Sequence, residues 1–192
     1  VTTGTASTFI GAHAADAITS GINNTAVGTF ALSADTLGNF SVAVGNGALE
    51  RQNFTTSTNS HNTAVGYDAG SRITTGIENC LLGSLAGDKL TDADSNTALG
   101  TGSLTTDTLG SRSVAVGGAA LGDQNFTTAT NAYNTAVGYA AGLTVTTGIK
   151  NSIIGGFSGD AITTGSKNVI VGYDSDVDSS GRFGAVALGS EL

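Results

Sequence analysis

The sequence predicts an all-β protein: a parallel β-solenoid of eleven coils, each of about 17 residues. Three observations predict this fold: a recurring glycine, a longer super-repeat, and columns of similar residues at equivalent positions. Successive glycines of the repeat are seventeen positions apart, except at two places where twenty-one positions separate them. These glycines are Gly11, Gly28, Gly45, Gly66, Gly83, Gly100, Gly117, Gly138, Gly155, Gly172 and Gly189.

The super-repeat spans seventy-two positions, so that Gly11, Gly83 and Gly155 are equivalent. Residues 39–77 and 111–149 match at 26 of 39 positions. Because the repeat covers almost the whole chain, we expect a single solenoid domain spanning residues 1–192. Coils stacked at the spacing of neighbouring strands, about 4.8 Å, would form a rod roughly 50 Å long.

Each coil is predicted to contain two short strands and two tight turns, because the repeat unit is too short for a pair of helices. The first strand is the segment before the glycine, such as residues 63–65, and the second lies near residues 73–75. Each strand is expected to end in a glycine, here Gly66 and Gly76, because glycine adopts the positive φ that a sharp turn requires.

Asparagine stands four residues before the repeat glycine in seven coils, for example at Asn24, Asn62 and Asn96. Stacking would place these amides on top of one another, where they can hydrogen-bond along the rod as amide ladders do. We therefore expect a polar spine along the solenoid.

Two neighbouring positions of the first strand are both apolar. The residue before the glycine is always aliphatic, and the residue before that is alanine in seven coils. Neighbouring strand residues face opposite sides, so one column fills the coil and the other needs a cover, which a second copy of the chain would supply. We expect a homo-oligomer with the alanine column near the interface. The expected interface residues are Ala26, Ala43, Ala64, Ala98, Ala115 and Ala136.

The two longer coils carry four extra residues each, in inserted loops at 52–59 and 124–131. Loops on a rigid scaffold are common binding sites, so these loops are candidates for binding a partner. The alternative is that the loops only pack between subunits, with Phe54 and Phe126 filling the gaps. The sequence leaves both alternatives open. The candidate partner-binding residues are Gln52, Asn53, Phe54, Thr55, Gln124, Asn125, Phe126 and Thr127.

Composition excludes several classes of protein. A net charge of −8 with only seven lysines and arginines argues against binding to nucleic acid or to anionic membranes. The single cysteine excludes a disulfide framework and a multi-cysteine zinc site. No apolar run approaches the roughly 18 residues of a membrane-spanning helix.

Candidate catalytic groups are few. His13 and His61 are the only histidines, and Cys80 is expected to be a small buried thiol without a role. No Ser-His-Asp set can be assembled from them, so we expect a protein that is not an enzyme and that needs no cofactor.

One short segment resembles the first half of a calcium loop. Asp174, Asp176 and Asp178 have the right spacing, but Ser179 stands where the loop needs glycine and Ala185 where it needs glutamate. The three aspartates are therefore a weak calcium candidate, and a solvated turn is the alternative.

The runs Asn62–Gly66, Ser41–Gly45, Ser113–Gly117 and Asn134–Gly138 resemble the head repeats of YadA-like trimeric autotransporter adhesins. They are also similar to shaft repeats of phage and viral tail-fibre proteins, and residues 62–76 and 134–148 carry the longer form of that pattern. The resemblance implies a left-handed parallel β-roll that assembles as a homotrimer in an extracellular fibre. The long unit of this chain favours the tail-fibre side.

The sequence thus predicts a non-enzymatic structural or adhesive segment of a virion tail fibre that contacts a host receptor or glycan. A bacterial surface adhesin head is the alternative. A further alternative is an ice-binding solenoid, suggested by threonine pairs such as 74–75, 146–147 and 163–164. A hexapeptide-repeat acyltransferase is disfavoured, because neither a six-residue sub-period nor a catalytic histidine is present.

Overall fold

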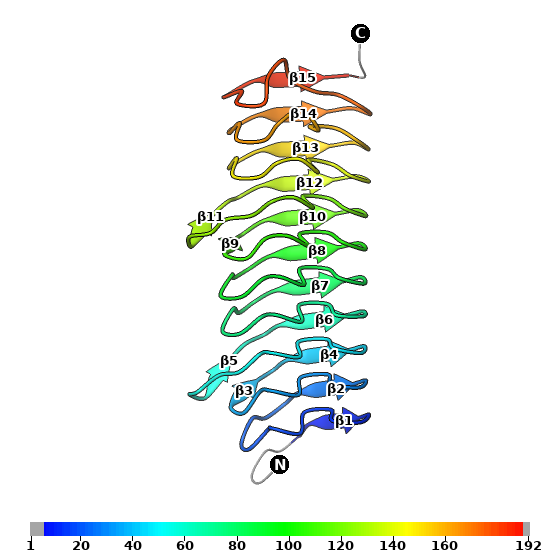
Figure 1. The fold of residues 1–192 in the computed structure, drawn as a ribbon, viewed down its shortest axis with the longest axis vertical. Coiled ribbons are helices and arrows are strands. Elements are labelled where there is room, and N and C mark those ends of the chain that lie inside the picture. The colour runs from blue at the N-terminus through cyan, green and yellow to red at the C-terminus, as the bar shows by residue number, and fades with distance from the viewer. Residues whose placement is uncertain (1–5, 190–192) are drawn as a thin grey trace.

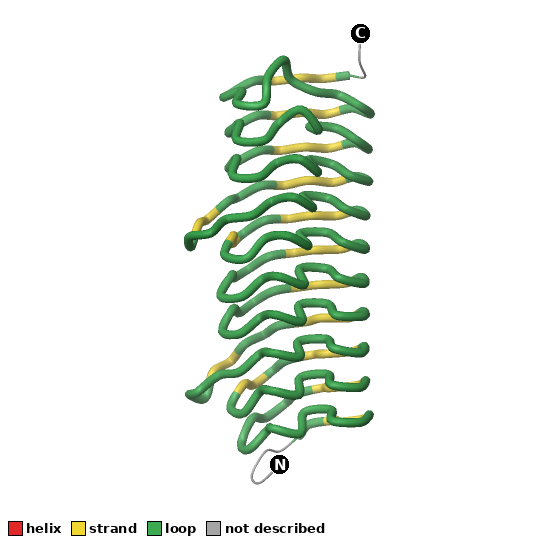
Figure 2. The backbone as a smooth tube through the Cα atoms, in the orientation of Figure 1, coloured by secondary structure: helices red, strands yellow, loops and turns green. Residues whose placement is uncertain are grey.

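The eleven predicted coils are confirmed. The computed structural model describes residues 6–189, which form a rod of stacked coils with the two termini at opposite ends (Figure 1). The described residues contain strands, turns and irregular backbone, but no helix, and so none that could span a membrane (Figure 2).

One eleven-stranded parallel sheet runs the length of the rod, with one three-residue strand from each coil. Its register pairs equivalent residues, so that Ala26 lies beside Ala43 and Val27 beside Val44. The strands are β1 (Thr8–Ile10), β2 (Thr25–Val27), β4 (Val42–Val44), β6 (Thr63–Val65), β7 (Cys80–Leu82), β8 (Thr97–Leu99), β10 (Val114–Val116), β12 (Thr135–Val137), β13 (Ser152–Ile154), β14 (Val169–Val171) and β15 (Val186–Leu188).

Four two-residue strands lie beside the inserted loops. β3 (Gly38–Asn39) pairs with β5 (Thr58–Asn59), and β9 (Gly110–Ser111) pairs with β11 (Thr130–Asn131). Both pairs lie on the side of the rod where the longer coils protrude (Figure 1).

The core of the solenoid is a column inside the coil. The middle residue of each sheet strand points inward, and it meets large side chains from the opposite wall, among them Leu49, Ile73 and Leu90, which are fully buried. Alanine is the commonest middle residue because the coil is narrow, and a larger side chain such as Leu81 stands opposite glycine. Each coil alone buries little, so the stacking of neighbours completes the core.

The prediction of a second strand near residues 73–75 is wrong. This wall of the coil is built from tight turns, and the chain enters the left-handed region at many residues other than glycine, including Leu49, Asp68 and Glu78. The segment still stacks, because the Thr74 N–H donates to the Thr91 carbonyl across 3.1 Å. Its backbone bends too sharply to continue as a strand.

Glycine is required at two kinds of position for different reasons. The repeat glycines have positive φ as predicted, for example +143° at Gly66. Gly76 does not, which corrects the expected positive φ at the second glycine. Glycine is needed there because a Cβ atom would lie 2.4 Å from the Ala93 carbonyl oxygen of the next coil.

The asparagine spine is confirmed as a buried column, with a different pattern of hydrogen bonds. The side chain of Asn79 donates to the Ala93 carbonyl at 2.8 Å and accepts from the Asn96 N–H at 3.0 Å. A side chain-to-side chain bond along the column is longer, 3.3 Å between Asn79 and Asn62. The spine therefore joins amide side chains to the backbone of the next coil, which satisfies polar groups that the tight turns leave unpaired.

Candidate functional site

The outer face of the sheet exposes a continuous row of aliphatic side chains. The residue before each repeat glycine points outward, and Leu82, Leu99 and Ile154 are between 42% and 45% exposed. The other outward position holds threonine, valine, serine or cysteine. No charged residue occupies either outward position of the eleven strands, so the face is flat, regular and uncharged.

The expected alanine interface is wrong. The six alanines are fully buried inside the coil of a single chain. They lie on the inward side of the strands, and the aliphatic residues next to them lie on the outer face. The alternation of side chains along a strand correctly predicted that the alanine and aliphatic columns face opposite sides. The interior of the coil is narrow, however, so alanine is the residue that points inward. The residues concerned are Ala26, Ala43, Ala64, Ala98, Ala115 and Ala136.

The inserted loops plug the coil of their own chain. Phe54 and Phe126 are each 5% exposed, and Gln52 and Gln124 are fully buried. These four residues therefore cannot contact a partner in the folded chain, which removes them from the predicted binding set. Asn53 is exposed and Asn125 is half-buried. Thr55 and Thr127 are exposed, so they remain candidates.

A buried polar cluster anchors each loop, and sequence reasoning missed it. The Asp35 carboxylate accepts from the Gln52 side chain at 2.7 Å and from the Gly38 and Phe54 N–H groups at 3.0 and 3.3 Å. Gln52 also accepts from Asn62 at 2.8 Å, which ties the cluster to the asparagine spine. The sequence does contain a signal of this cluster, because Asp35 is a charged residue at a position that is aliphatic in five other coils.

The second loop repeats this cluster with the same roles. Asp107 accepts from the Gln124 side chain at 2.5 Å and from the Gly110 and Phe126 N–H groups at 3.0 and 3.1 Å. Burial raises the pKa of the Asp107 carboxyl above its usual value, although the Gln124 amide and backbone N–H groups oppose the shift. Each cluster therefore holds its loop by a carboxyl group inside the rod.

The calcium candidate is not supported. In the described part of the chain, no group of three or more His, Cys, Asp or Glu side chains could hold a metal ion. Asp176 accepts from the Ala161 N–H of the preceding coil at 2.5 Å, whereas Asp178 pairs with Arg182 at 3.5 Å. The pKa of Asp160 is raised, first by a hydrogen bond with Asp176 and then by burial and charge repulsion.

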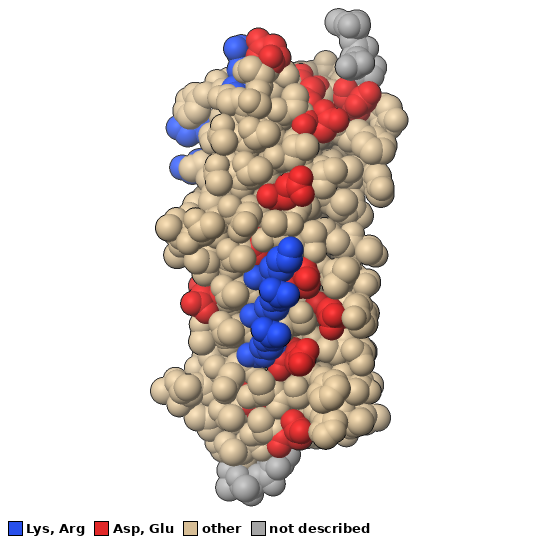
Figure 3. All heavy atoms as spheres, viewed as in Figure 1, with Lys and Arg blue, Asp and Glu red and all other residues tan. Residues whose placement is uncertain are grey.

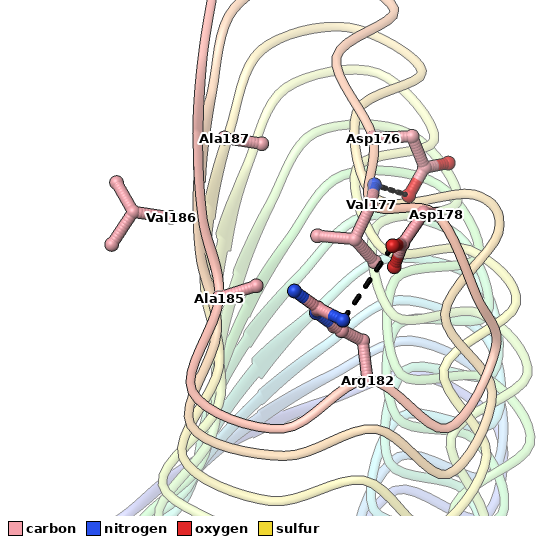
Figure 4. Close-up of a pocket in the computed structure, with 7 residues that line it drawn as sticks. All are labelled: Asp176, Val177, Asp178, Arg182, Ala185, Val186 and Ala187. Atoms are coloured by element: carbon pink, nitrogen blue, oxygen red, sulfur yellow. Dashed lines mark hydrogen bonds and ion pairs between the residues drawn. The ribbon is translucent and has the colours of Figure 1, made fainter.

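A hollow of about 200 Å³ lies beside these residues at the C-terminal end of the rod. Figure 4 shows Arg182 directed at Asp178, Ala185 and Ala187 facing the hollow, and Val186 on the other side of the backbone. Its lining is the inner wall of the last described coils, so the hollow belongs to the interior of the solenoid.

The two histidines and the cysteine lie in separate parts of the described chain and form no common site. His13 stacks on Phe30 with ring centroids 5.1 Å apart, and His61 stacks on Phe40 at 5.2 Å. Cys80 is exposed on the outer face of β7, which corrects its expected burial.

Threonines of the predicted ice-binding row serve the fold. The hydroxyls of Thr74 and Thr75 both donate to Asp92, at 2.8 and 2.6 Å. Thr91 and Thr146 donate to carbonyl groups of the next coil at 3.0 and 3.1 Å. These hydroxyls hold coils together and are not free to order water in a regular array.

A scan against protein-family models found no match to the chain, and neither did searches of curated proteins and of solved structures. The surfaces that the coils present are therefore the guide to function.

Proposed function

We propose that the chain is a non-enzymatic structural segment of an extracellular trimeric fibre, most consistent with a phage or viral tail fibre that contacts a host surface. The observation that carries the proposal is the uncharged outer face of the eleven-stranded sheet. Monomeric soluble proteins rarely expose contiguous apolar patches above a few hundred Å². A face of this length and regularity is suited to association with other copies.

Identical chains are a natural cover for this face, because the repeat of one coil matches that of another. Aliphatic side chains recur on every strand, so two or three rods aligned along their axes can pack coil by coil. The threefold order and the left-handed sense of the coil are both what the resemblance to trimeric fibre repeats implies. A rod whose coils are joined by one continuous sheet also suits a spacer in a fibre.

A bacterial surface adhesin head uses the same geometry and is the alternative within this class. The genes that flank the coding region, or further domains encoded with it, would separate the two. In either case, contact with a receptor or glycan is proposed for the exposed residues of the inserted loops, including Asn53 and Thr55.

Ice binding remains a second candidate because of one observation. The outer face of the sheet presents threonine in one column and aliphatic residues in the other on many strands, as in β2, β6 and β12. Thermal hysteresis measured on the purified chain separates the two functions, because a face covered by subunits cannot meet ice.

The native cysteine provides a direct test of a covered face. Cys80 is exposed on β7 in the single chain. If copies of the chain cover the sheet, Cys80 should react slowly with a thiol reagent in the native assembly and quickly after dissociation. A matched control carries Cys80→Thr, the residue of β6 and β8 at this position, together with Thr147→Cys on an exposed turn. Equally fast labelling at both sites in the native protein would refute the covered face.

A further inference from the structure

Three basic residues occupy the same position in three successive coils. Arg51, Arg72 and Lys89 each lie six residues after a repeat glycine. Hydrogen bonds from the Arg51 N–H to Ser71 and from the Arg72 N–H to Asp88, both 3.1 Å, hold these coils side by side. Figure 3 shows a stripe of basic side chains parallel to the long axis near the middle of the rod. We call these three residues the basic stripe.

The basic stripe has no charged partner within residues 6–189. The two ion pairs of the described chain join His13 to Asp16 and Asp178 to Arg182, so none of the three cations is paired. Their side chains make no hydrogen bond to this part of the chain either, and the coil spacing puts the backbone positions of successive stripe residues about 4.8 Å apart. Like charges carried on neighbouring coils repel, and the repulsion acts against the stacking of these coils.

The fold does not require these charges. The super-repeat offers a comparison within the same chain, because the equivalent positions one super-repeat further on hold Asp123, Thr144 and Ala161. Those coils stack in the same register without a basic residue. The charges at 51, 72 and 89 are therefore additions to a scaffold that tolerates an acid, a hydroxyl or a methyl group there.

Of the four other basic residues within residues 6–189, Arg112, Lys167 and Arg182 have side-chain partners, whereas Lys150 has none. Arg112 hydrogen-bonds to Asn131 and lies 5.9 Å from the centre of the Tyr133 ring. Lys167 lies 4.7 Å from the centre of the Phe183 ring. The stripe thus differs from the rest of the chain in having three unpaired cations in successive coils, whereas Lys150 is a single unpaired cation.

The basic stripe is flanked by polar and acidic residues. The first inserted loop continues directly from Arg51 and exposes Asn53, Thr55 and Thr56. Half-buried acids, Glu50 and Asp88, adjoin the stripe in sequence. Acidic atoms border the basic atoms in Figure 3, so the positive charge is confined to a line.

From these observations we propose that Arg51, Arg72 and Lys89 bind an extended acidic glycan, a chain of sugars bearing carboxylate or sulfate groups, laid along the rod. The spacing of coils, about 4.8 Å, is comparable to the length of one sugar ring in an extended polysaccharide, so successive acidic groups can meet successive cations. The loop hydroxyls and amides can hydrogen-bond to sugar hydroxyls. This site goes beyond the proposed fibre function and does not depend on the number of chains in the assembly.

A glycan fits better than a nucleic acid. Proteins that bind single strands combine basic grooves with exposed aromatic residues on which bases stack. The aromatic residue of the adjoining loop, Phe54, is buried and cannot serve as such a platform.

The test compares binding of polygalacturonate, a linear polymer of acidic sugars, with binding of neutral dextran of similar length. The test variant is Arg51→Asp, Arg72→Thr, Lys89→Ala, which copies the residues found one super-repeat later. The control variant is Arg112→Ser, Lys150→Glu, Lys167→Ser, which copies Glu78 and Ser95 of the same column. Both variants are four charge units more negative than the parent, because each reverses one charge and removes two.

We expect the parent to bind polygalacturonate and not dextran, with affinity that falls as salt is raised. The test variant should lose at least tenfold in affinity, whereas the control variant should stay within about twofold of the parent. An equal loss of affinity in both variants would mean that net charge alone determines binding, and it would overturn the proposed site. Unchanged binding by the test variant would overturn it as well, as would tighter binding of the parent to single-stranded DNA than to polygalacturonate. Circular dichroism confirms that each variant is folded, and light scattering on the same samples reports the fibre assembly separately.

Discussion

At the scale of the residue, the repeat glycines carry two constraints at once. Gly66 has a φ of +143°, which side chains strongly disfavour. A Cβ atom on Gly66 would also lie 2.4 Å from the carbonyl oxygen of Gly83 in the next coil. By contrast, many other left-handed residues of the turns, such as Leu49, carry side chains, because their φ of about 50° is less costly.

Substitution of Gly66 by alanine should therefore destabilise the solenoid by about 3 kcal/mol or more. Gly102→Ala is the matched control, because Gly102 has a φ of +67° and no atom within 4 Å of its added Cβ. That change should cost about 1 kcal/mol, the usual penalty of a left-handed alanine. Chemical denaturation monitored by circular dichroism measures both, and equal losses would contradict the close approach at Gly66.

The buried carboxyl group of Asp107 makes the stability of the solenoid depend on pH. The carboxyl of Asp107 is held inside the rod, and burial raises its pKa in the folded state above the ordinary value of 3.8. A raised pKa means that the folded chain favours the protonated form. The resulting stabilisation is present below the unfolded pKa and is lost as pH rises through the folded pKa.

The parent should therefore gain stability relative to Asp107→Asn as pH falls from about 7 to about 4. The difference between the two free energies of unfolding isolates this group, since all other carboxyl groups titrate in both proteins. A difference that stays constant would show that the hydrogen bonds to Asp107 offset its burial, and one that shrinks as pH falls would show that they outweigh it.

At the scale of the element, the inserted coil is a solenoid coil with its own small core. Phe54 fills the loop while Gln52 links Asp35 to the asparagine spine, so four extra residues are accommodated without breaking the sheet between β4 and β6. The loops could be located from the two longer intervals between repeat glycines. Their interior could not be predicted, because an aromatic residue among small polar residues suits a plug and a binding surface equally.

Phe54→Ala should destabilise the chain by about 3 to 4 kcal/mol, because it empties a buried aromatic site. Phe40→Ala is the control, since Phe40 is 38% exposed and stacks only at the surface. Thermal unfolding measures the two changes. A loss at Phe54 no larger than that at Phe40 would mean that the loop does not depend on its plug.

At the scale of the whole molecule, the sequence predicted the number of coils because each coil repeats the same residues at Gly11, Gly28 and onward. It could not predict which apolar column lies inside. Ala64 and Val65 are both apolar neighbours, and only the width of the coil decides that alanine points inward. The second strand was overpredicted, because left-handed residues such as Asp68 and Glu78 give no distinct signal in the sequence.

The corrected orientation predicts opposite outcomes for two aspartate substitutions on one strand. Leu99→Asp lies on the exposed outer face of β8, so it should leave the coil folded and disrupt association. Ala98→Asp places a charge inside the coil and should unfold the chain. Circular dichroism and size-exclusion chromatography of both variants check this, and a folded Ala98→Asp protein would contradict the burial of the alanine column.

We propose that copies of this chain cover one another through the outer face of the sheet. Light scattering on the purified chain tests it most directly, because one chain has a mass of 18.8 kDa. We predict the mass of three chains for the parent and of one chain for Leu99→Asp. A folded parent that has the mass of a single chain at micromolar concentration would contradict the claim.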